Sequence, residues 1–117
     1  LLPTLIANGS PSMDVCRSDI FAPVATFETY TDFRDAVNRL NATRYGLQAG
    51  VFTNRFADIW HAFGAIECGG IVINDIPTFR ADHQPYGGMK NSGIGREGIR
   101  YAIDDMTEVK FLSINNR

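Results

Sequence analysis

The sequence predicts an α/β fold in which parallel strands are joined by covering helices. Apolar runs at 47–53 and 71–74 have the length and composition of buried strands, and a stretch with helical spacing lies between them. A strand-like run at 24–28 and a helical pattern at 33–40 come earlier. The order strand, helix, strand, helix, strand favours an open parallel sheet with right-handed crossovers and flanking helices.

The helices are predicted from apolar residues that recur on one side. The first has Phe33, Ala36, Val37 and Leu40, and the second has Phe56, Ile59, Trp60, Phe63 and Ile66. Thr31 is the expected N-cap of the first helix and Asn54 that of the second. Gly69 and Gly70 are expected to stop the second helix. A short strand is also expected at 5–6.

The last third of the chain departs from this alternation. A loop of roughly 20 residues follows position 74, and loops of that length in compact domains are usually functional. Residues 99–106 have the spacing of a short helix. Residues 107–114 alternate like a strand with one wetter face, and we expect this strand to pair outside the main sheet.

Composition excludes several classes of partner. Eleven basic and thirteen acidic residues give a net charge of −2, without a basic tract that would engage nucleic acid. No apolar run approaches the roughly 18 residues of a membrane span, and no leader pattern is visible, so a cytoplasmic protein is expected. The chain starts at Leu1 and enters an apolar run at once, which indicates a piece of a longer protein.

Cysteine and glycine patterns look like chemical motifs but fit them poorly. Cys16 and Cys68 match neither a C-x-x-C pair nor a zinc spacing, so we expect reduced structural thiols and no metal site. Residues 93–98 fit G-x-G-x-x-G, but the preceding strand and the later acidic residue of a dinucleotide loop are missing. The glycine-rich run 85–98 instead predicts a fixed loop that lines a site or an interface.

Four blocks together resemble the C-terminal part of NAD(P)-dependent aldehyde dehydrogenases. They occur at 19–23, 41–53, 67–74 and 85–98, in the order and spacing of the family. The first reads Asp-Ile-Phe-Ala-Pro where the family has E-[IV]-F-G-P, and the last is similar to P-[FY]-GG-x-K-x-SG-x-G-RE. The resemblance implies that 1–106 is part of the catalytic domain and that 107–117 is an oligomerisation strand.

The resemblance also implies a reaction. In this family a cysteine thiolate attacks the aldehyde, a hydride passes to NAD or NADP, and a water activated by a glutamate releases the acid. It implies that the nucleophile, the general base and the coenzyme-binding domain lie before residue 1. We therefore expect no catalytic residue in this chain, and neither Cys16 nor Cys68 as the nucleophile.

Asp19 and Phe21 are the expected coenzyme-binding residues. By resemblance, Asp19 replaces a glutamate that accepts hydrogen bonds from the nicotinamide ribose, and Phe21 corresponds to a ring near the nicotinamide. Aspartate is one methylene shorter, so the reach to the ribose is reduced. The alternatives are a solvated turn residue for Asp19 and a plain core ring for Phe21.

The expected substrate-binding residues lie in the long loop. Phe79 and Tyr86 resemble aromatic residues that line the aldehyde tunnel of the family. If Arg80 and His83 point inward, they would favour an anionic or polyhydroxylated aldehyde. The alternative is that Arg80 and His83 face solvent.

Arg96 and Glu108 are the expected interface residues of a homo-oligomer, a dimer or tetramer. The resemblance implies that the last strand crosses to a neighbouring subunit, where Glu108 would hold arginines, with Arg96 as one partner. The alternative is an exposed edge strand with an unpaired charge. Two other functions stay open: a non-catalytic assembly module, or a fragment of an enzyme that passes the acyl group to coenzyme A.

Overall fold

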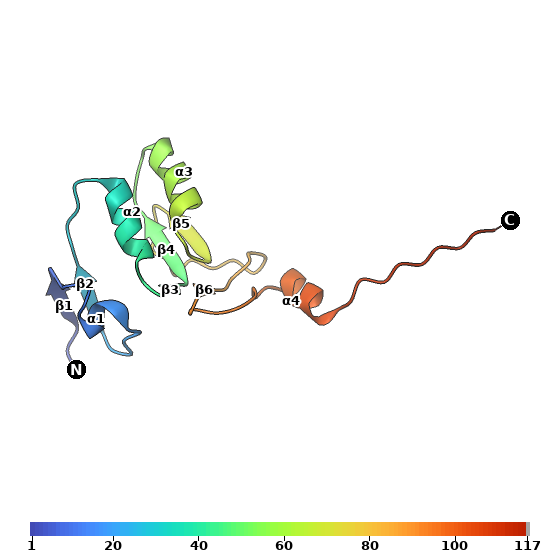
Figure 1. Ribbon diagram of the computed structural model, residues 1–117, viewed down its shortest axis with the longest axis horizontal. Coiled ribbons are helices and arrows are strands. Elements are labelled where there is room, and N and C mark those ends of the chain that lie inside the picture. The colour runs from blue at the N-terminus through green and yellow to red at the C-terminus, as the bar shows by residue number, and fades with distance from the viewer. Residues whose placement is uncertain (117) are drawn as a thin grey trace.

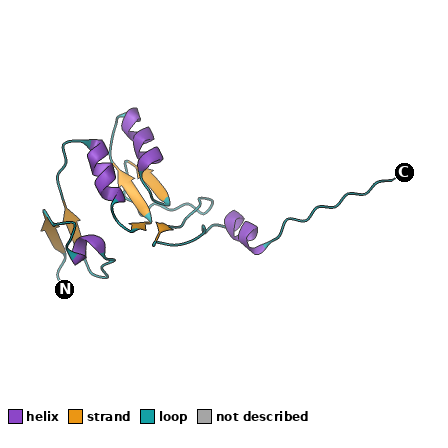
Figure 2. Ribbon diagram, viewed as in Figure 1, coloured by secondary structure: helices purple, strands orange, loops and turns teal. Residues whose placement is uncertain are grey.

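The computed structural model describes residues 1–116 and confirms an α/β protein with parallel strand pairs and flanking helices (Figures 1 and 2). The elements are β1 (Thr4–Ala7), α1 (Asp14–Arg17), β2 (Val24–Phe27), α2 (Phe33–Asn41), β3 (Tyr45–Gly46), β4 (Gln48–Val51), α3 (Phe56–Ala65), β5 (Gly70–Ile73), β6 (Met89–Lys90) and α4 (Ile99–Met106). None of the described helices is long and apolar enough to cross a membrane.

The described strands form three two-stranded sheets and do not join into the single βαβαβ sheet that the element order favoured. β1 pairs with β2 and β4 with β5, both in parallel, whereas β3 pairs with β6 in antiparallel orientation. Figure 1 shows β1, α1 and β2 as a group apart from α2, α3, β4 and β5. Apolar periodicity identifies the faces of a strand but not its neighbour, and the chain order alone suggested a pairing between β2 and β4.

The core lies where α2 and α3 cover the β4–β5 pair. Its buried residues are Val37 from α2, Ala49 and Val51 from β4, Ala62 from α3, and Ile66 just after it. Alternate positions of β4 face the helices, as expected for a strand with a period of two. The small Ala62 side chain is fully buried, so it sits where α3 is packed most closely against the rest of the core.

The apolar side predicted for α3 is divided in the structure. Ala62 and Ile66 are buried, whereas Phe56, Trp60 and Phe63 are largely exposed. The three exposed rings stack edge to face along the helix, with centroids 5.7 and 6.0 Å apart. The spacing therefore predicted the helix correctly but placed its large aromatic rings on the wrong side.

Helix and strand ends differ from the predictions by one to several residues. Asp32, not Thr31, caps α2, because its side chain accepts a hydrogen bond from the Asp35 amide at 2.8 Å. α3 starts after Arg55, whose amide donates to Thr53 Oγ1 at 3.1 Å, and it ends before Ile66, well ahead of the expected glycine stop. The predicted strand 47–53 is shorter in the structure, where β4 covers only Gln48–Val51.

The C-terminal region contains the predicted helix but not the predicted strand. α4 occupies Ile99–Met106 as expected, and residues 107–116 extend from it without secondary structure (Figure 1). Val109, Phe111, Leu112 and Ile114 are exposed along this segment. A strand needs a neighbouring backbone, and the described part of this chain provides none here. Residue 117, the last of the expected oligomerisation segment, lies outside the described residues.

Candidate functional site

The long loop starts at the carboxyl end of β5, where β4 also ends. Asn74 holds the two strand ends together: its amide donates to the Val51 carbonyl at 2.8 Å, and its Oδ1 accepts from the Thr53 amide at 2.8 Å. Asn74 adopts a left-handed φ of 59°, which turns the chain out of the sheet. Ligands of open α/β sheets gather beyond such strand ends.

Arg80, Tyr86 and Glu97 come together within this loop. The guanidinium carbon of Arg80 lies 3.4 Å from the centroid of the Tyr86 ring, a cation–π stack. Arg80 Nη2 is 3.7 Å from Glu97 Oε2. Tyr86 and Glu97 are also joined as an isolated antiparallel bridge, in which the Tyr86 amide donates to the Glu97 carbonyl at 3.1 Å. Two predicted substrate residues, Arg80 and Tyr86, therefore form one surface.

The other two predicted substrate residues, Phe79 and His83, are not among the residues that make these described contacts. His83 lines a hollow of about 610 Å³ beside α4. The other residues of the hollow are Asp82, Ile99, Arg100, Ile103 and Asp104. Phe79 is exposed, and its amide donates to the Ile76 carbonyl at 3.4 Å. Arg80 and His83 therefore face different surroundings, which nearness in sequence could not reveal.

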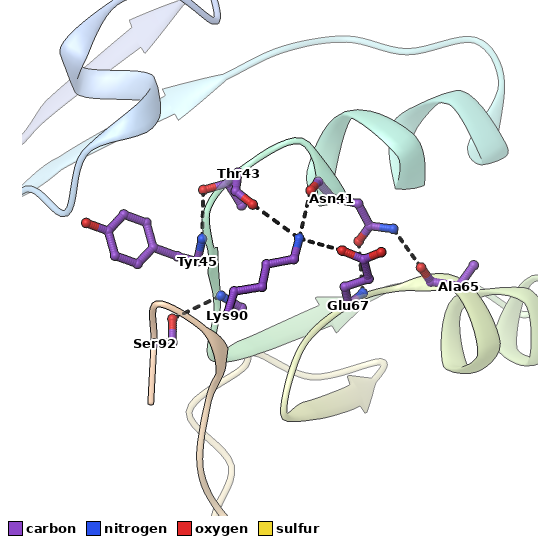
Figure 3. Close-up of polar contacts among 8 residues, drawn as sticks. Asn41, Thr43, Tyr45, Ala65, Glu67, Lys90 and Ser92 are labelled. Atoms are coloured by element: carbon purple, nitrogen blue, oxygen red, sulfur yellow. Dashed lines mark hydrogen bonds and ion pairs between the residues drawn. The ribbon is translucent and has the colours of Figure 1, made fainter. Parts of the chain in front are cut away.

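A polar network centred on Lys90 holds the base of the loop (Figure 3). Lys90 Nζ donates to the Asn41 carbonyl at 2.8 Å and the Thr43 carbonyl at 3.1 Å, and it pairs with Glu67 Oε2 at 2.7 Å. The Asn41 side chain donates to the Ala65 carbonyl at 2.6 Å and accepts from the Glu67 amide at 2.9 Å. The network thus joins the end of α2, the turn after α3, and β6.

Ser92 adds a second attachment next to this network (Figure 3). Its Oγ accepts a hydrogen bond from the Gly46 amide at 2.9 Å, and the Asn91 amide donates to the Arg44 carbonyl at 2.9 Å. Sequence reasoning assigned no role to Asn41, Glu67, Lys90 or Ser92. Their sequence positions could have indicated a role, because each is a polar residue within one of the blocks 41–53, 67–74 and 85–98 that resemble the family.

The loop passes so close to the strands that side chains are excluded. A Cβ at Gly69 would overlap the Gly87 carbonyl oxygen, and one at Gly46 would overlap the Glu67 carbonyl oxygen. Gly69 is held there by its amide, which donates to the Gly46 carbonyl at 3.1 Å and the Leu47 carbonyl at 3.0 Å. The glycines at these positions permit close backbone approach.

Arg96 closes the glycine-rich loop on itself. Its Nη1 donates to the Gly88 carbonyl at 3.1 Å and to the Gly95 carbonyl at 2.7 Å. Glu108 is exposed in the extended segment after α4. The structure therefore does not join the predicted interface residues Arg96 and Glu108 within one chain, and a contact between them would have to form between subunits.

Asp19 and Phe21 lie on the segment between α1 and β2. Asp19 is exposed and lines a cavity of about 460 Å³, together with Ile20, Tyr45 and Cys68 among others. Phe21 is 96% exposed, so its ring lies outside the core formed by the described residues.

The two cysteines are both free thiols, as expected for structural residues. Cys68 is half-buried, and its Sγ donates to the Gly70 carbonyl at 3.0 Å. Burial raises the pKa of the Cys68 thiol, while backbone hydrogen bonds from Gly70 and Ala49 oppose the rise. A thiol with a raised pKa holds less thiolate at neutral pH, which makes Cys68 a poor nucleophile.

Parallel strand pairs, covering helices and a long loop beyond the strand ends are the features of an open α/β fold. The model of the aldehyde dehydrogenase family matches residues 1–112. The chain belongs to the aldehyde dehydrogenase family.

Curated relatives show the same relationship at the sequence level. The chain is 42% identical over 114 residues to a 3-sulfolactaldehyde dehydrogenase of Priestia aryabhattai, covering 97% of this chain and 24% of that protein. It is 46% identical over 117 residues to a lactaldehyde dehydrogenase of Methanococcus aeolicus, covering 100% of this chain and 25% of that protein. The chain thus spans about a quarter of the length of these relatives.

Solved structures agree with this assignment. Aldehyde dehydrogenase 21 from Physcomitrella patens, in complex with the reaction product succinate, matches with a TM-score of 0.87 and 46% identity, over 91% of this chain and 22% of that chain. A glyceraldehyde-3-phosphate dehydrogenase from Methanocaldococcus jannaschii, complexed with NADP, matches with a TM-score of 0.83 and 37% identity, over 92% and 23%. The local fold is therefore that of a segment of an aldehyde dehydrogenase.

Proposed function

We propose that the protein containing this chain oxidises a short anionic or hydroxylated aldehyde to its carboxylic acid with NAD or NADP. The observation that carries this proposal is the Arg80 guanidinium stacked on Tyr86 in the loop beyond β5. A fixed guanidinium can make paired, charge-assisted hydrogen bonds to a carboxylate or sulfonate. The names of the relatives support this direction, since they include sulfolactaldehyde and lactaldehyde dehydrogenases and a complex with succinate.

The residues of this chain have binding roles in the proposal. Arg80 would hold the anionic or hydroxylated end of the aldehyde, with His83 as a second polar contact at the α4 side of the loop. Tyr86 and Phe79 would form apolar walls that exclude water from the reacting carbonyl. The cysteine that forms the thiohemiacetal would come from the part of the protein outside this chain, and the bound coenzyme would accept the hydride.

Asp19 and Phe21 form the proposed coenzyme contact. The exposed Asp19 carboxylate would accept hydrogen bonds from the ribose next to the nicotinamide, and the bare Phe21 ring would pack near it. We place the reaction in the cytoplasm, where Cys16 and Cys68 would remain reduced.

Asp19→Ala in the full-length protein is expected to raise the KM for the coenzyme by roughly ten- to hundredfold and to change the KM for the aldehyde little, because charge-assisted hydrogen bonds to a carboxylate contribute about 1.5–3 kcal/mol. Steady-state kinetics with each substrate varied in turn would measure both constants. Asp19→Glu is the matched control and should keep coenzyme binding. Unchanged coenzyme kinetics in Asp19→Ala would remove Asp19 from the site.

The reaction itself can be tested with two proteins. The full-length protein should form reduced coenzyme when it receives a short anionic aldehyde and NAD or NADP. The 117-residue chain purified alone should form none, because the proposal assigns it no nucleophile. Turnover by the isolated chain that disappears on Cys16→Ser or Cys68→Ser would contradict the proposal.

A second role in assembly is favoured by the segment after α4. Residues 107–116 are extended and carry exposed apolar side chains, among them Val109, Phe111 and Ile114. Such an unpaired segment can add a strand to a neighbouring subunit, where Glu108 would lie near arginines such as Arg96. Light scattering should show a dimer or tetramer of the full-length protein that dissociates on deletion of 107–117. A deletion variant of unchanged mass would count against this role.

A further inference from the structure

We propose that Glu97 is a specificity-determining residue: it acts as the internal counter-ion of Arg80 and limits how strongly the loop prefers anionic aldehydes. This inference rests on the proposed function and deepens it. It assigns a role to a residue that the sequence patterns did not single out, from its position beside the Arg80–Tyr86 stack.

Glu97 is fixed next to Arg80 by the backbone. The antiparallel bridge between Tyr86 and Glu97 places the Glu97 side chain on the same surface as the Tyr86 ring. The guanidinium of Arg80 covers that ring at 3.4 Å and points Nη2 toward Glu97 Oε2 at 3.7 Å. Because main-chain atoms form the bridge, replacing the Glu97 side chain leaves the bridge donors and acceptors in place.

The pair is weak enough to be exchanged for a ligand. The side chains of Arg80 and Glu97 are 51% and 72% exposed, and their separation of 3.7 Å is long for a charged hydrogen bond. Exposed pairs of this kind contribute little, so a carboxylate or sulfonate with two well-aligned oxygens can replace Glu97 on the guanidinium. The same Glu97 charge repels an incoming anion but has little effect on a neutral aldehyde.

The charges of Arg80 and Glu97 therefore have opposite effects on the binding of an anionic aldehyde. Arg80 attracts the anionic end of the substrate, and Glu97 reduces that attraction while leaving neutral aldehydes unaffected. Glu97 therefore sets the ratio of the kcat/KM values for anionic and neutral aldehydes, and not the overall rate. It also keeps the Arg80 charge compensated when no anion is bound.

The experiment compares Glu97→Gln with the unchanged full-length protein, using a carboxylated aldehyde and a neutral aldehyde of equal length. Glu97→Gln should raise the anionic-to-neutral ratio of kcat/KM by about two- to fivefold, the size expected for loss of one exposed charge pair. Glu97→Ala should do the same. In an Arg80→Gln background the effect should disappear. Asp105→Asn removes one exposed acidic charge from α4 and is the matched control, with an unchanged ratio.

A binding readout separates this inference from the proposed function. Calorimetry with succinate and with uncharged succinamide should show tighter succinate binding to Glu97→Gln and equal succinamide binding. Equal changes for both compounds, or an effect that persists without Arg80, would overturn the role of Glu97. Absence of aldehyde turnover by every protein would refute the proposed function, whereas the succinate titrations would still decide the inference.

Discussion

Gly69→Ala is expected to destabilise the full-length protein by roughly 3 kcal/mol or more, because the new methyl group would overlap the Gly87 carbonyl oxygen. The backbone cannot shift to relieve this overlap easily. The Gly69 amide donates to the Gly46 and Leu47 carbonyls, and Gly70 next to it starts β5. Shifting Gly69 away from the Gly87 carbonyl would break these hydrogen bonds. Chemical denaturation of the variant and the unchanged protein would measure the loss.

Gly64→Ala is the matched control for this change. Gly64 lies within α3, and a Cβ built there meets nothing within 4 Å. Alanine favours a helix over glycine by about 1 kcal/mol, so this variant should be as stable as the unchanged protein or slightly more so. If Gly69→Ala and Gly64→Ala had the same stability, the close approach of loop and strand described here would be wrong.

Lys90→Met is expected to cost about 2–3 kcal/mol of stability and to reduce aldehyde turnover as well. The change removes the charged partner of Glu67 and the donor to the Asn41 and Thr43 carbonyls. Hydrogen bonds to charged groups contribute about 1.5–3 kcal/mol, and the Glu67 carboxylate would be left without its cation. The loss of turnover follows because Lys90 holds the base of the loop that carries Arg80 and Tyr86. Thermal unfolding and steady-state kinetics would record the two effects.

Lys110→Met controls for the loss of one positive charge. Lys110 is exposed in the segment after α4, which has no secondary structure. It takes no part in the described contacts of the Lys90 network. Its replacement should leave the melting temperature and the KM for the aldehyde nearly unchanged. Equal melting temperatures for Lys90→Met and Lys110→Met would show that the Lys90 network does not support the loop.

The sequence predicted local structure well because local structure depends on spacing. The apolar repeats of α2 and α4 and the runs of β4 and β5 lie where the periods placed them. The pairing of strands was not predictable in the same way, since β2 and β4 lie in different sheets although only one helix and the short β3 separate them in the chain. The N-cap Asp32 was missed because Thr31 and Asp32 are both good caps, and only backbone geometry decides between neighbours.

Some of the contacts in the loop join residues that were named from the sequence, and others do not. Arg80 and Tyr86 were both named from the sequence and do lie together. Arg80 and His83 are only three residues apart, yet the turn between them directs His83 toward α4. Glu97 and the Lys90 network depend on contacts between segments far apart in sequence, which no local pattern reports.

The most direct test of the account is the substrate preference of the full-length protein with and without the Arg80 guanidinium. The kcat/KM for a short carboxylated or sulfonated aldehyde should exceed that for a neutral aldehyde of equal length by roughly tenfold or more, as expected for charge-assisted hydrogen bonds. Arg80→Gln should remove most of this preference while the neutral aldehyde reacts at a similar rate. A protein that oxidises both aldehydes equally well, or an Arg80→Gln variant with unchanged preference, would contradict the account.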